Sequence, residues 1–540
     1  MTEELRLLAR EVARTAFGFE ELRPGQEEAV AGVLGGRDVL AVLPTGSGKS
    51  AIYQLAGALI DGPTIVVSPL IALQQDQVDA IGGRLGGAIQ VNSSLGVRDR
   101  REALDLVKEG GVEFVFVAPE QLANDESFSH LSAARPSIVV IDEAHCISSW
   151  GHDFRPDYLR LGDFIERLGR PPVLALTATA SPPVRRDIIE RLRMRDPLEI
   201  VRGFERPNIS LAVEAYPASE EADAALLETA EQTPGSGIVY VATRRRAEDF
   251  AEALTARGRA ASAYHAGLKA TERDEVHHRF LDDEGAIVVA TIAFGMGIDA
   301  PHVRFVLHAD PPESLDAYYQ EFGRAGRDGE PASARLFNVL AESGRRRFFA
   351  GLGELTEGEL QSVVDAADPT DGESDFDALV EATGLSSTSL SNAVDLLSAV
   401  GALRLTDRTI EPASEISADG VIEAALEVQE TRRAFERTRG EMMERYLATS
   451  ACRWQTILAY FGEPTEERCG RCDNCRRGSA DVAVEQPWPL ETRVRHPEFG
   501  VGMVIDYEGD TVTVLFDEGG YRTLAVPLVL ERELLVAADE

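Results

Sequence analysis

The sequence predicts an α/β fold class with two tandem α/β domains, because three features of its first 340 residues agree. Short runs rich in valine and isoleucine recur, stretches with a helical pattern separate them, and the whole series occurs twice. Continuous apolar runs flanked by helices are typical of parallel strands that are buried on both faces. We expect strands at residues 39–43, 65–68, 114–117, 138–141 and 173–176, and then at 238–241, 261–264, 287–290, 303–308 and 335–338. A junction near 202–208 predicts a cleft between the two domains.

The elements outside the two series complete the expected architecture. Residues 5–17 read as an amphipathic helix, residues 351–425 as an acidic helical region, and residues 421–446 as a long helix. A cysteine cluster and a linker at 479–489 follow. In the last 50 residues apolar positions alternate around Glu508-Gly509-Asp510, which is typical of a hairpin turn. We expect a small all-β module at this end of the chain.

Length and composition limit the class of protein. A chain of 540 residues predicts three to five domains. With 44% hydrophobic and 27% charged residues, a wholly disordered chain is excluded. The net charge of −37 excludes a protein that coats nucleic acid through a generally basic surface, so any such contact must be local.

The charged residues and the cysteines bear on the cellular environment. Only three of the 54 basic residues are lysines, Lys49, Lys108 and Lys269. An acidic, lysine-poor surface fits a high-salt cytoplasm, and genome composition alone is the alternative. No signal peptide or membrane span is evident, which predicts a cytoplasmic protein without a membrane partner. Four of the five cysteines cluster late in the chain, which favours a metal site over disulfides.

A glycine-rich segment after the first expected strand predicts a phosphate-binding loop. Leu43-Pro44 is followed by Thr45, Gly46, Ser47, Gly48, Lys49 and Ser50, at the start of a helix. Backbone N–H groups of such a loop surround phosphate oxygens, and the helix N-terminus adds partial positive charge. Lys49 would reach the β- and γ-phosphates and Ser50 would bind Mg²⁺. The alternative is an ordinary glycine-rich turn.

Acidic and basic groups at two later positions fit the same chemistry. Asp142 and Glu143 end the strand at 138–141, where Asp142 can hold Mg²⁺ and Glu143 can accept a proton from attacking water. Gln320, Arg324 and Arg327 come late in the second domain, where the arginines can neutralise charge on a leaving phosphate. A solvated acidic turn and surface salt bridges are the respective alternatives.

An aromatic segment directly after these carboxylates predicts a single-strand binding loop. Residues 150–158 contain Trp150, His152, Phe154, Arg155 and Tyr158. Bases stack on aromatic rings at about 1–3 kcal/mol each without sequence preference, and stacking survives salt that weakens phosphate contacts. The position after Asp142 and Glu143 would let the nucleotide state move these rings. The alternative is a small aromatic core.

The four clustered cysteines have the spacing of a structural zinc site. Cys452, Cys469, Cys472 and Cys475 form C-x16-C-x2-C-x2-C, in which the two CxxC turns supply adjacent ligands and Cys452 a remote one. Four thiolates bind Zn²⁺ in a closed tetrahedron. Cys146 stands apart, and we expect it to be a packing residue.

Together these motifs resemble a superfamily 2 helicase of the RecQ family over residues 10–340 and 426–478. The most specific stretch is DEAHCISSWGHDFRPDY at 142–158, supported by FGFEELRPGQ, SPLIAL, LTATA, FERPNI, ATIAFGMGIDAP and YYQEFGRAGRDG. The resemblance implies two RecA-like lobes, ATP and Mg²⁺ as cofactors, zinc in the cysteine cluster, and 3′→5′ unwinding of duplex DNA through translocation on a single strand in repair or recombination.

The resemblance also assigns individual roles. It implies that Gln26, with Arg23 beside it, reads the adenine, and that Thr177 and Thr179 couple the lobes. Asp299 and the loop 295–297 would touch nucleotide and strand, and Arg327, with Arg324 beside it, would be the arginine finger. Phe322 replaces the threonine that is usual in the family.

The chain departs from the family pattern in two places. About 75 residues separate the second lobe from the zinc segment, and residues 375–383, 386–398 and 402–406 resemble the helix–turn–helix and strand of a winged helix. The expected recognition helix, 386–400, contains no Lys or Arg, which favours a structural or protein-binding role over DNA binding. Residues 490–530 resemble an SH3/Tudor-like barrel of a kind that binds proteins, including RNA polymerase. Its Tyr507, Tyr521 and His496 either line a binding face or pack the barrel.

The predicted organisation is an ATP-binding lobe at 1–205, a second lobe at 206–345, a winged-helix-like insert at 346–425, a zinc domain at 426–478, a linker at 479–489 and an SH3/Tudor-like domain at 490–540. Its expected partners are single-stranded and duplex DNA, with RNA polymerase or repair proteins at the C-terminal module. A DEAH-type RNA helicase and a scaffold with a spent ATPase remain alternatives, and the intact Lys49, Asp142 and Glu143 argue against the second.

Overall fold

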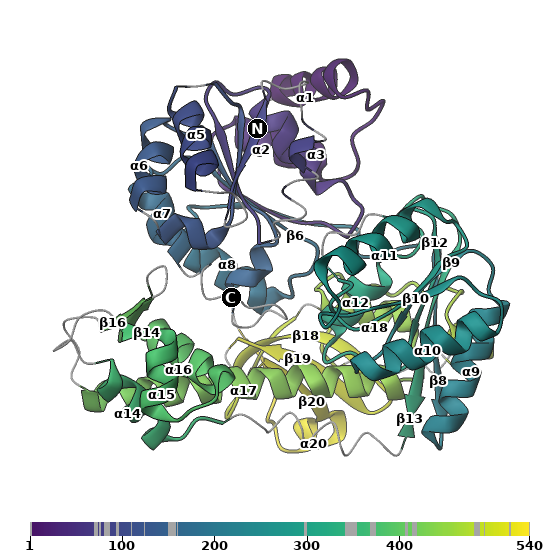
Figure 1. Cartoon of the computed structure of the whole chain (residues 1–540). Coiled ribbons are helices and arrows are strands. Elements are labelled where there is room, and N and C mark those ends of the chain that lie inside the picture. Colours follow the sequence, from purple (N-terminus) through teal and green to yellow (C-terminus); the bar gives the residue numbers. More distant parts are fainter. Residues whose placement is uncertain are drawn as a thin grey trace.

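Two α/β lobes stand side by side above a long helix and a small β-module in the computed structural model (Figure 1). The structure describes the following residues: 3–69, 74, 77–79, 81, 87–92, 97–109, 111–123, 125–148, 158, 160–295, 300–340, 354–367, 374–405, 409–412, 418–479, 487–490, 492–517 and 520–538. Within these ranges no helix is both long and apolar enough to cross a membrane.

The first lobe is built on a seven-stranded sheet in which every pair of neighbouring strands is parallel, in the order β3-β4-β2-β5-β6-β1-β7. The strands are β1 (Val39–Val42), β2 (Thr64–Val67), β3 (Ala88–Val91), β4 (Phe114–Val117), β5 (Ile138–Ile141), β6 (Val173–Thr177) and β7 (Leu198–Val201). The flanking helices are α1 (Glu3–Ala16), α2 (Gln26–Leu34), α3 (Lys49–Gly57), α5 (Val97–Lys108), α6 (Asp125–Ala133), α7 (Leu161–Arg167) and α8 (Pro182–Arg191). The five central strands are buried on both faces, as their apolar runs predict.

The second lobe has a six-stranded parallel sheet in the order β10-β11-β9-β12-β13-β8. Its strands are β8 (Ile209–Tyr216), β9 (Ser236–Tyr240), β10 (Ala261–Tyr264), β11 (Ile287–Ala290), β12 (Val303–His308) and β13 (Ala332–Val339). The helices are α9 (Ser219–Gln232), α10 (Arg244–Ala256), α11 (Ala270–Asp282) and α12 (Leu315–Phe322). Two successive parallel α/β sheets confirm the predicted fold class.

Three strands of the two lobes were missed by the sequence analysis, namely β3, β7 and β8, and all three lie at sheet edges, whereas the fourth edge strand, β10, was predicted. An edge strand is covered less completely, so it carries polar residues among its apolar ones. Gln90 in β3 and Glu199 in β7 interrupt the apolar run, and β8 alternates between buried and half-buried positions. The continuous pattern that identified the central strands is therefore absent at the edges.

The insert after the second lobe is a small domain with its own apolar core. Its elements are α14 (Glu357–Ala366), β14 (Ser374–Asp375), α15 (Phe376–Thr383), α16 (Ser387–Ala399), β15 (Leu403–Leu405) and β16 (Thr409–Pro412), with an antiparallel sheet in the order β14-β16-β15. Gly384, at φ 69°, ends α15 in the left-handed conformation that glycine adopts at low cost. The two helices and the strand expected at 375–383, 386–398 and 402–406 are present, and the winged-helix-like identity of the insert stays a prediction.

The described residues after the insert form one long helix, three short ones and a five-stranded antiparallel sheet. The helices are α17 (Ala418–Ala448), α18 (Arg453–Tyr460) and α19 (Asp473–Arg477). The C-terminal elements are β17 (Arg493–His496), β18 (Gly500–Glu508), β19 (Thr511–Phe516), β20 (Gly520–Ala525), α20 (Val526–Glu531) and β21 (Val536–Ala537), with the sheet order β20-β19-β18-β17-β21. The hairpin predicted at Gly509 joins β18 to β19. Most of the expected linker lies outside the described residues, and the domain boundaries stay predictions.

Candidate functional site between the lobes

The loop from Leu43 to Gly48 curls between the end of β1 and the start of α3. Gly46 and Gly48 have φ values of 78° and 76°, which only glycine adopts readily. A side chain on Gly48 would meet the Gln26 amide nitrogen at 2.8 Å, and one on Gly46 would meet Cγ of Arg327 at 3.1 Å. The glycines therefore permit both the turn and the close approach of neighbouring groups.

Buried polar atoms in this loop are left for a ligand. The hydroxyls of Thr45 and Ser47 are buried, and neither makes a hydrogen bond among the described residues. Buried polar groups normally have partners, so an unpaired pair in a glycine loop at a helix N-terminus fits a phosphate site. The residues present thus fit the predicted nucleotide phosphates.

Lys49 is the first residue of α3 and points back into the loop, where Nζ donates to the Leu43 carbonyl at 3.3 Å. Burial lowers the pKa of Lys49, while the carboxylates of Glu143 and Asp142 oppose that shift. The ammonium is therefore held, at the cost of desolvation, between the loop and the acidic groups. A bound nucleotide phosphate would stabilise the charged ammonium in place of the water that burial has removed.

Gln26 and Arg23 fasten α2 to the loop. The Gln26 side-chain amide donates to the carbonyls of Ser47 and Gly48 at 2.8 and 2.9 Å, and its oxygen accepts from the Arg23 backbone N–H at 2.8 Å. The Arg23 guanidinium donates to the Gly46 carbonyl. Both residues thus lie where the sequence places them, next to the phosphate loop, and adenine recognition by Gln26 stays a prediction.

Asp142 and Glu143 lie at the carboxyl end of β5, facing Lys49. Burial, followed by the charge of Glu143, raises the pKa of Asp142 to about 7, and Lys49 moves it in the opposite direction. Glu143 adopts a left-handed conformation at φ 48°, which is uncommon for a non-glycine residue. Two carboxylates that repel each other at a dry site are suited to a divalent cation and to proton transfer.

A series of close polar contacts leads from these carboxylates to the end of β6. The imidazole Nδ1 of His145 lies 3.3 Å from Glu143 and 2.9 Å from the Thr177 hydroxyl. That hydroxyl donates to the Thr179 carbonyl at 3.1 Å. Thr177 and Thr179 therefore lie beside the acidic pair, and their role in coupling the lobes stays a prediction. Cys146 is fully buried, as expected of a packing residue.

The two predicted arginines occupy different positions at the end of α12. Arg327 packs against Gly46 of the opposite lobe, and its charge contributes to lowering the pKa of Lys49. Arg324 is buried in the second lobe, with a terminal nitrogen 3.9 Å from the position of a side chain on Gly295. Arg327 therefore meets the phosphate loop in this arrangement. Gln320 lies one turn before Arg324, on α12.

Arg206 was missed as a site residue, although its FERPNI segment had been noticed. Its guanidinium donates to the carbonyls of Gly323, Ala325 and Gly326 at 2.8–3.1 Å and to that of Thr45 at 3.4 Å. One side chain thus holds the arginine segment of the second lobe against the phosphate loop of the first. Because all four acceptors are backbone carbonyls, which every residue has, the sequence gives no sign of these bonds.

The predicted DNA loop is described only at its end. Trp150, His152, Phe154 and Arg155 lie outside the described residues, as does Asp299. Tyr158 is fully buried, and its hydroxyl donates to the Asp142 carbonyl at 3.1 Å. This burial argues against base stacking on Tyr158 and makes it a fastening point between the loop and the acidic pair.

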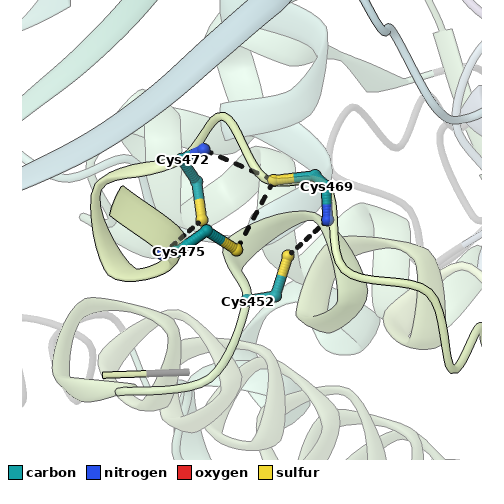
Figure 2. Close-up of side chains that lie close together, drawn as sticks. All are labelled: Cys452, Cys469, Cys472 and Cys475. Atoms are coloured by element: carbon teal, nitrogen blue, oxygen red, sulfur yellow. Dashed lines mark hydrogen bonds between the residues drawn. The ribbon is translucent and has the colours of Figure 1, made fainter. Parts of the chain in front are cut away.

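The four clustered cysteines converge (Figure 2). Their sulfur atoms all lie within 4.8 Å of one another, with Cys469 and Cys475 3.9 Å apart, and no disulfide joins them. Backbone N–H groups of Cys469, Cys472 and Cys475 donate to neighbouring sulfurs at 3.3–3.5 Å. Thiolates 2.3 Å from a tetrahedral zinc ion lie about 3.8 Å apart, so the cluster fits Zn²⁺.

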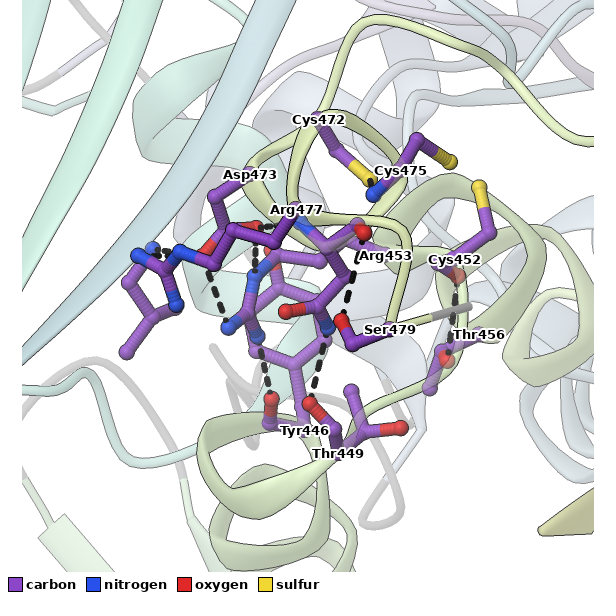
Figure 3. Close-up of polar contacts among 12 residues, drawn as sticks. Tyr446, Thr449, Cys452, Arg453, Thr456, Cys472, Asp473, Cys475, Arg477 and Ser479 are labelled. Atoms are coloured by element: carbon purple, nitrogen blue, oxygen red, sulfur yellow. Dashed lines mark hydrogen bonds and ion pairs between the residues drawn. The ribbon is translucent and has the colours of Figure 1, made fainter. Parts of the chain in front are cut away.

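An ion pair buried beside the cluster ties it to the second lobe (Figure 3). Arg453 donates to both carboxylate oxygens of Asp473 at 2.6 and 3.0 Å and to the Tyr446 carbonyl at 2.7 Å. Asp473 also accepts from the backbone N–H of Val213 in β8, at 3.1 Å. Hydrogen bonds therefore join the metal-binding turn to α17, to α18 and to the sheet of the second lobe.

Comparison with known proteins agrees with this geometry. The chain matches the DEAD/DEAH box helicase family at residues 23–187, the helicase conserved C-terminal domain at 221–329 and the RecQ zinc-binding family at 414–476. Two solved structures share the fold: the DUF1998 helicase MrfA bound to DNA (TM-score 0.53, 17% identity, 78% of this chain and 64% of that one) and Mss116p bound to ssRNA and AMP-PNP (TM-score 0.53, 16% identity, 85% and 89%). The fold and the site define the class, a superfamily 2 helicase.

The sequence relatives narrow the class to a family. The chain is 33% identical to the ATP-dependent DNA helicase RecQ of Bacillus subtilis over 523 residues, which cover 96% of this chain and 76% of that protein. It is 42% identical to the ATP-dependent DNA helicase RecQ of Pasteurella multocida over 339 residues, 63% of this chain and 53% of that protein, so it spans about half of that relative. The chain belongs to the RecQ family. The SH3/Tudor-like identity of the C-terminal sheet stays a prediction.

Proposed function

We propose that this protein is an ATP-dependent DNA helicase that moves 3′→5′ along one strand and separates duplex DNA. One observation carries the proposal: Arg327 of the second lobe packs against the phosphate loop of the first, so hydrolysis chemistry and lobe movement share one interface. The relatives named as ATP-dependent DNA helicases support the substrate class.

In the proposed reaction, water attacks the γ-phosphorus of ATP and the bond to the β,γ-bridging oxygen breaks, leaving ADP and phosphate. Lys49 and the loop N–H groups hold the phosphates, while Ser50 and Asp142 would hold Mg²⁺, which would screen phosphate charge. Glu143 accepts the proton of the water. Arg327 stabilises charge on the departing group from the opposite lobe, which requires the lobes to be closed.

We propose that two contacts of the acidic pair, Asp142 and Glu143, couple ATP hydrolysis to the movement of DNA. His145 connects Glu143 to Thr177 and Thr179, and Tyr158 connects Asp142 to the end of the aromatic loop. Loss of the γ-phosphate removes the group that holds these elements together, so the loop moves when the nucleotide changes. Trp150 and Phe154 remain the proposed stacking rings.

Other parts of the prediction extend the proposal. A role in repair or recombination and a cytoplasmic location rest on the resemblance and the composition. A protein partner, such as RNA polymerase, would have to use a face of the C-terminal sheet other than the one carrying Tyr521, because that side chain is buried against α18. His496 and Tyr507 are also buried and pack the module.

The test is strand separation on duplexes with a 3′ or a 5′ single-stranded tail, with ATP and Mg²⁺, across a KCl series. Unwinding from the 3′ tail alone, absent from Lys49→Ala, is the expected result. Unwinding from the 5′ tail reverses the polarity. ATP hydrolysis stimulated by RNA and not by DNA overturns the substrate and favours an RNA helicase, and activity near molar KCl supports a high-salt cytoplasm.

A further inference from the structure

The C-terminal sheet has two apolar faces. One set of residues, including Val504, Val514 and Phe516, packs into a core inside the module. Another set, Ile505, Leu515 and Tyr521, belongs to the core that continues into both helicase lobes and the zinc segment. Ile505 directly follows Val504 in β18 and therefore points to the opposite face of the sheet. The module is therefore docked on the enzyme, along α17 (Figure 1).

Tyr521 in β20 makes the most specific contact of the docked face. Its ring stacks on that of Tyr460 in α18, with centroids 4.8 Å apart and planes 17° apart, and its hydroxyl donates to the Tyr460 carbonyl at 3.1 Å. Both rings are fully buried. Burial raises the pKa of Tyr521 far above its usual value, so the phenol stays protonated and remains a donor.

Tyr460 in turn contacts α12, the helix that precedes Arg324 and Arg327. Its hydroxyl donates to the Asp316 carboxylate in the first turn of α12. Arg439 of α17 lies 3.4 Å from the same carboxylate and donates to the Ser314 hydroxyl at 2.7 Å. Ser314 is the N-cap of α12 and accepts from the Ala317 N–H. The start of α12 is thus held by buried, directional bonds from α17 and α18.

Aromatic packing holds the other end of α12 to α18 and to Phe461, the residue directly after it. The ring of Phe322 meets Trp454 edge-on at 5.8 Å, and Tyr319 meets Phe461 at 5.0 Å. Buried aromatic pairs are sensitive to small displacements because their contacts are close-packed. Since Arg327 follows this helix by five residues, the position of its guanidinium depends on how α12 is seated.

The docked face also touches the first lobe. Ser181, which caps α8 two residues after Thr179, is a neighbour of the Tyr521 phenol, and it shifts the pKa of that group. Arg186 of α8 pairs with Asp517 at 3.4 Å. One face of the module therefore contacts the elements that follow Thr179 in lobe one and, through Tyr460, those that precede Arg327 in lobe two.

We propose that Tyr460 and Tyr521 are positioning residues for ATP hydrolysis, and that the C-terminal β-module is a structural part of the ATPase which seats α12 so that Arg327 meets the phosphate loop. The inference rests on the proposed function. It assigns the module a role inside the chain, where the resemblance suggested a protein-binding tail.

The test compares Tyr460→Phe and Tyr521→Phe with Tyr507→Phe in the full-length protein. Tyr507 is the matched control, because among the described residues its hydroxyl bonds only to backbone atoms of Trp488 within the module core. In Tyr460→Phe we expect kcat for ATP hydrolysis to fall about tenfold with KM for ATP changed less than twofold, because the phosphate loop is untouched. Tyr521→Phe keeps the stacking and should show a smaller fall, and Tyr507→Phe should match the wild type.

A double variant separates positioning from general damage. If Tyr460 acts through Arg327, then adding Tyr460→Phe to Arg327→Ala should change kcat less than twofold. Additive losses, an equal loss in Tyr507→Phe, or an unchanged kcat in Tyr460→Phe each overturn the inference.

Amide hydrogen exchange in α12 gives a readout that does not depend on activity. It should become faster in Tyr460→Phe and stay unchanged in Tyr507→Phe, and unaltered exchange in both overturns the inference. If the wild-type protein hydrolyses no ATP, the proposed function fails, and the exchange measurement still decides whether Tyr460 holds α12.

Discussion

The phosphate loop and the zinc cluster are both predicted from short motifs, but they differ in how their polar groups are satisfied. At the cysteine cluster, backbone N–H groups point at the sulfurs, and the adjoining ion pair of Arg453 and Asp473 is bonded at 2.6 and 3.0 Å. At the phosphate loop, the hydroxyls of Thr45 and Ser47 are buried without partners among the described residues.

Because of this difference, the two sites are expected to contribute differently to stability and to activity. The zinc cluster supplies bonds that the fold uses, so its loss should reduce both stability and activity. The phosphate loop keeps buried groups ready for a ligand, an arrangement that costs stability in the free protein. Removing one of its charges should therefore reduce activity alone.

The largest effect is expected at the zinc cluster. Cys472→Ser removes one metal ligand, the sulfur that accepts the Cys475 N–H, and the N-cap of α19. Zinc content should fall by at least half, the thermal midpoint should drop because metal binding contributes several kcal/mol to folding, and ATP hydrolysis should fall with it. Metal analysis and calorimetry measure this. Cys146→Ala, outside the cluster, should retain its zinc, and a fully zinc-loaded Cys472→Ser would contradict the assignment.

An intermediate effect, confined to activity, is expected at the phosphate loop. Lys49→Ala removes the ammonium that faces the phosphates and should lower ATP hydrolysis at least about a hundredfold. Because burial lowers the pKa of Lys49, its loss should leave the thermal midpoint within a few degrees of the wild type. Hydrolysis at the wild-type rate would show that the site is wrongly placed.

The smallest effect is a pH dependence of stability in nucleotide-free and magnesium-free protein. Burial raises the pKa of Asp142 to about 7, above its value in the unfolded chain. Between about pH 4 and pH 7 the folded state holds a proton that the unfolded state has lost, so stability falls as pH rises through this range. Asp142→Asn should be as stable as the wild type near pH 4 and more stable at pH 8. Parallel unfolding curves for the two proteins across this range would contradict the shift.

The sequence predicted those parts of the molecule whose pattern is local. Buried central strands have continuous apolar runs, and Gly46, Gly48 and Lys49 lie within one turn of each other, as do the ligands Cys472 and Cys475. Edge strands such as β8 escaped because half-buried residues break the pattern. Tyr158 looked like an exposed stacking ring because aromatic character alone does not show which way a side chain is turned.

The sequence by itself determined the fold class, the phosphate loop, the acidic pair and the metal ligands, because each depends on residues close in the chain and on chemistry that few residue types supply. Only the tertiary structure decided that Arg327 packs against Gly46 of the phosphate loop, that Arg206 joins the lobes, and that Tyr521 docks on Tyr460. These contacts join residues 61–281 positions apart. They depend on how separately folded elements pack, and local patterns carry no record of that packing.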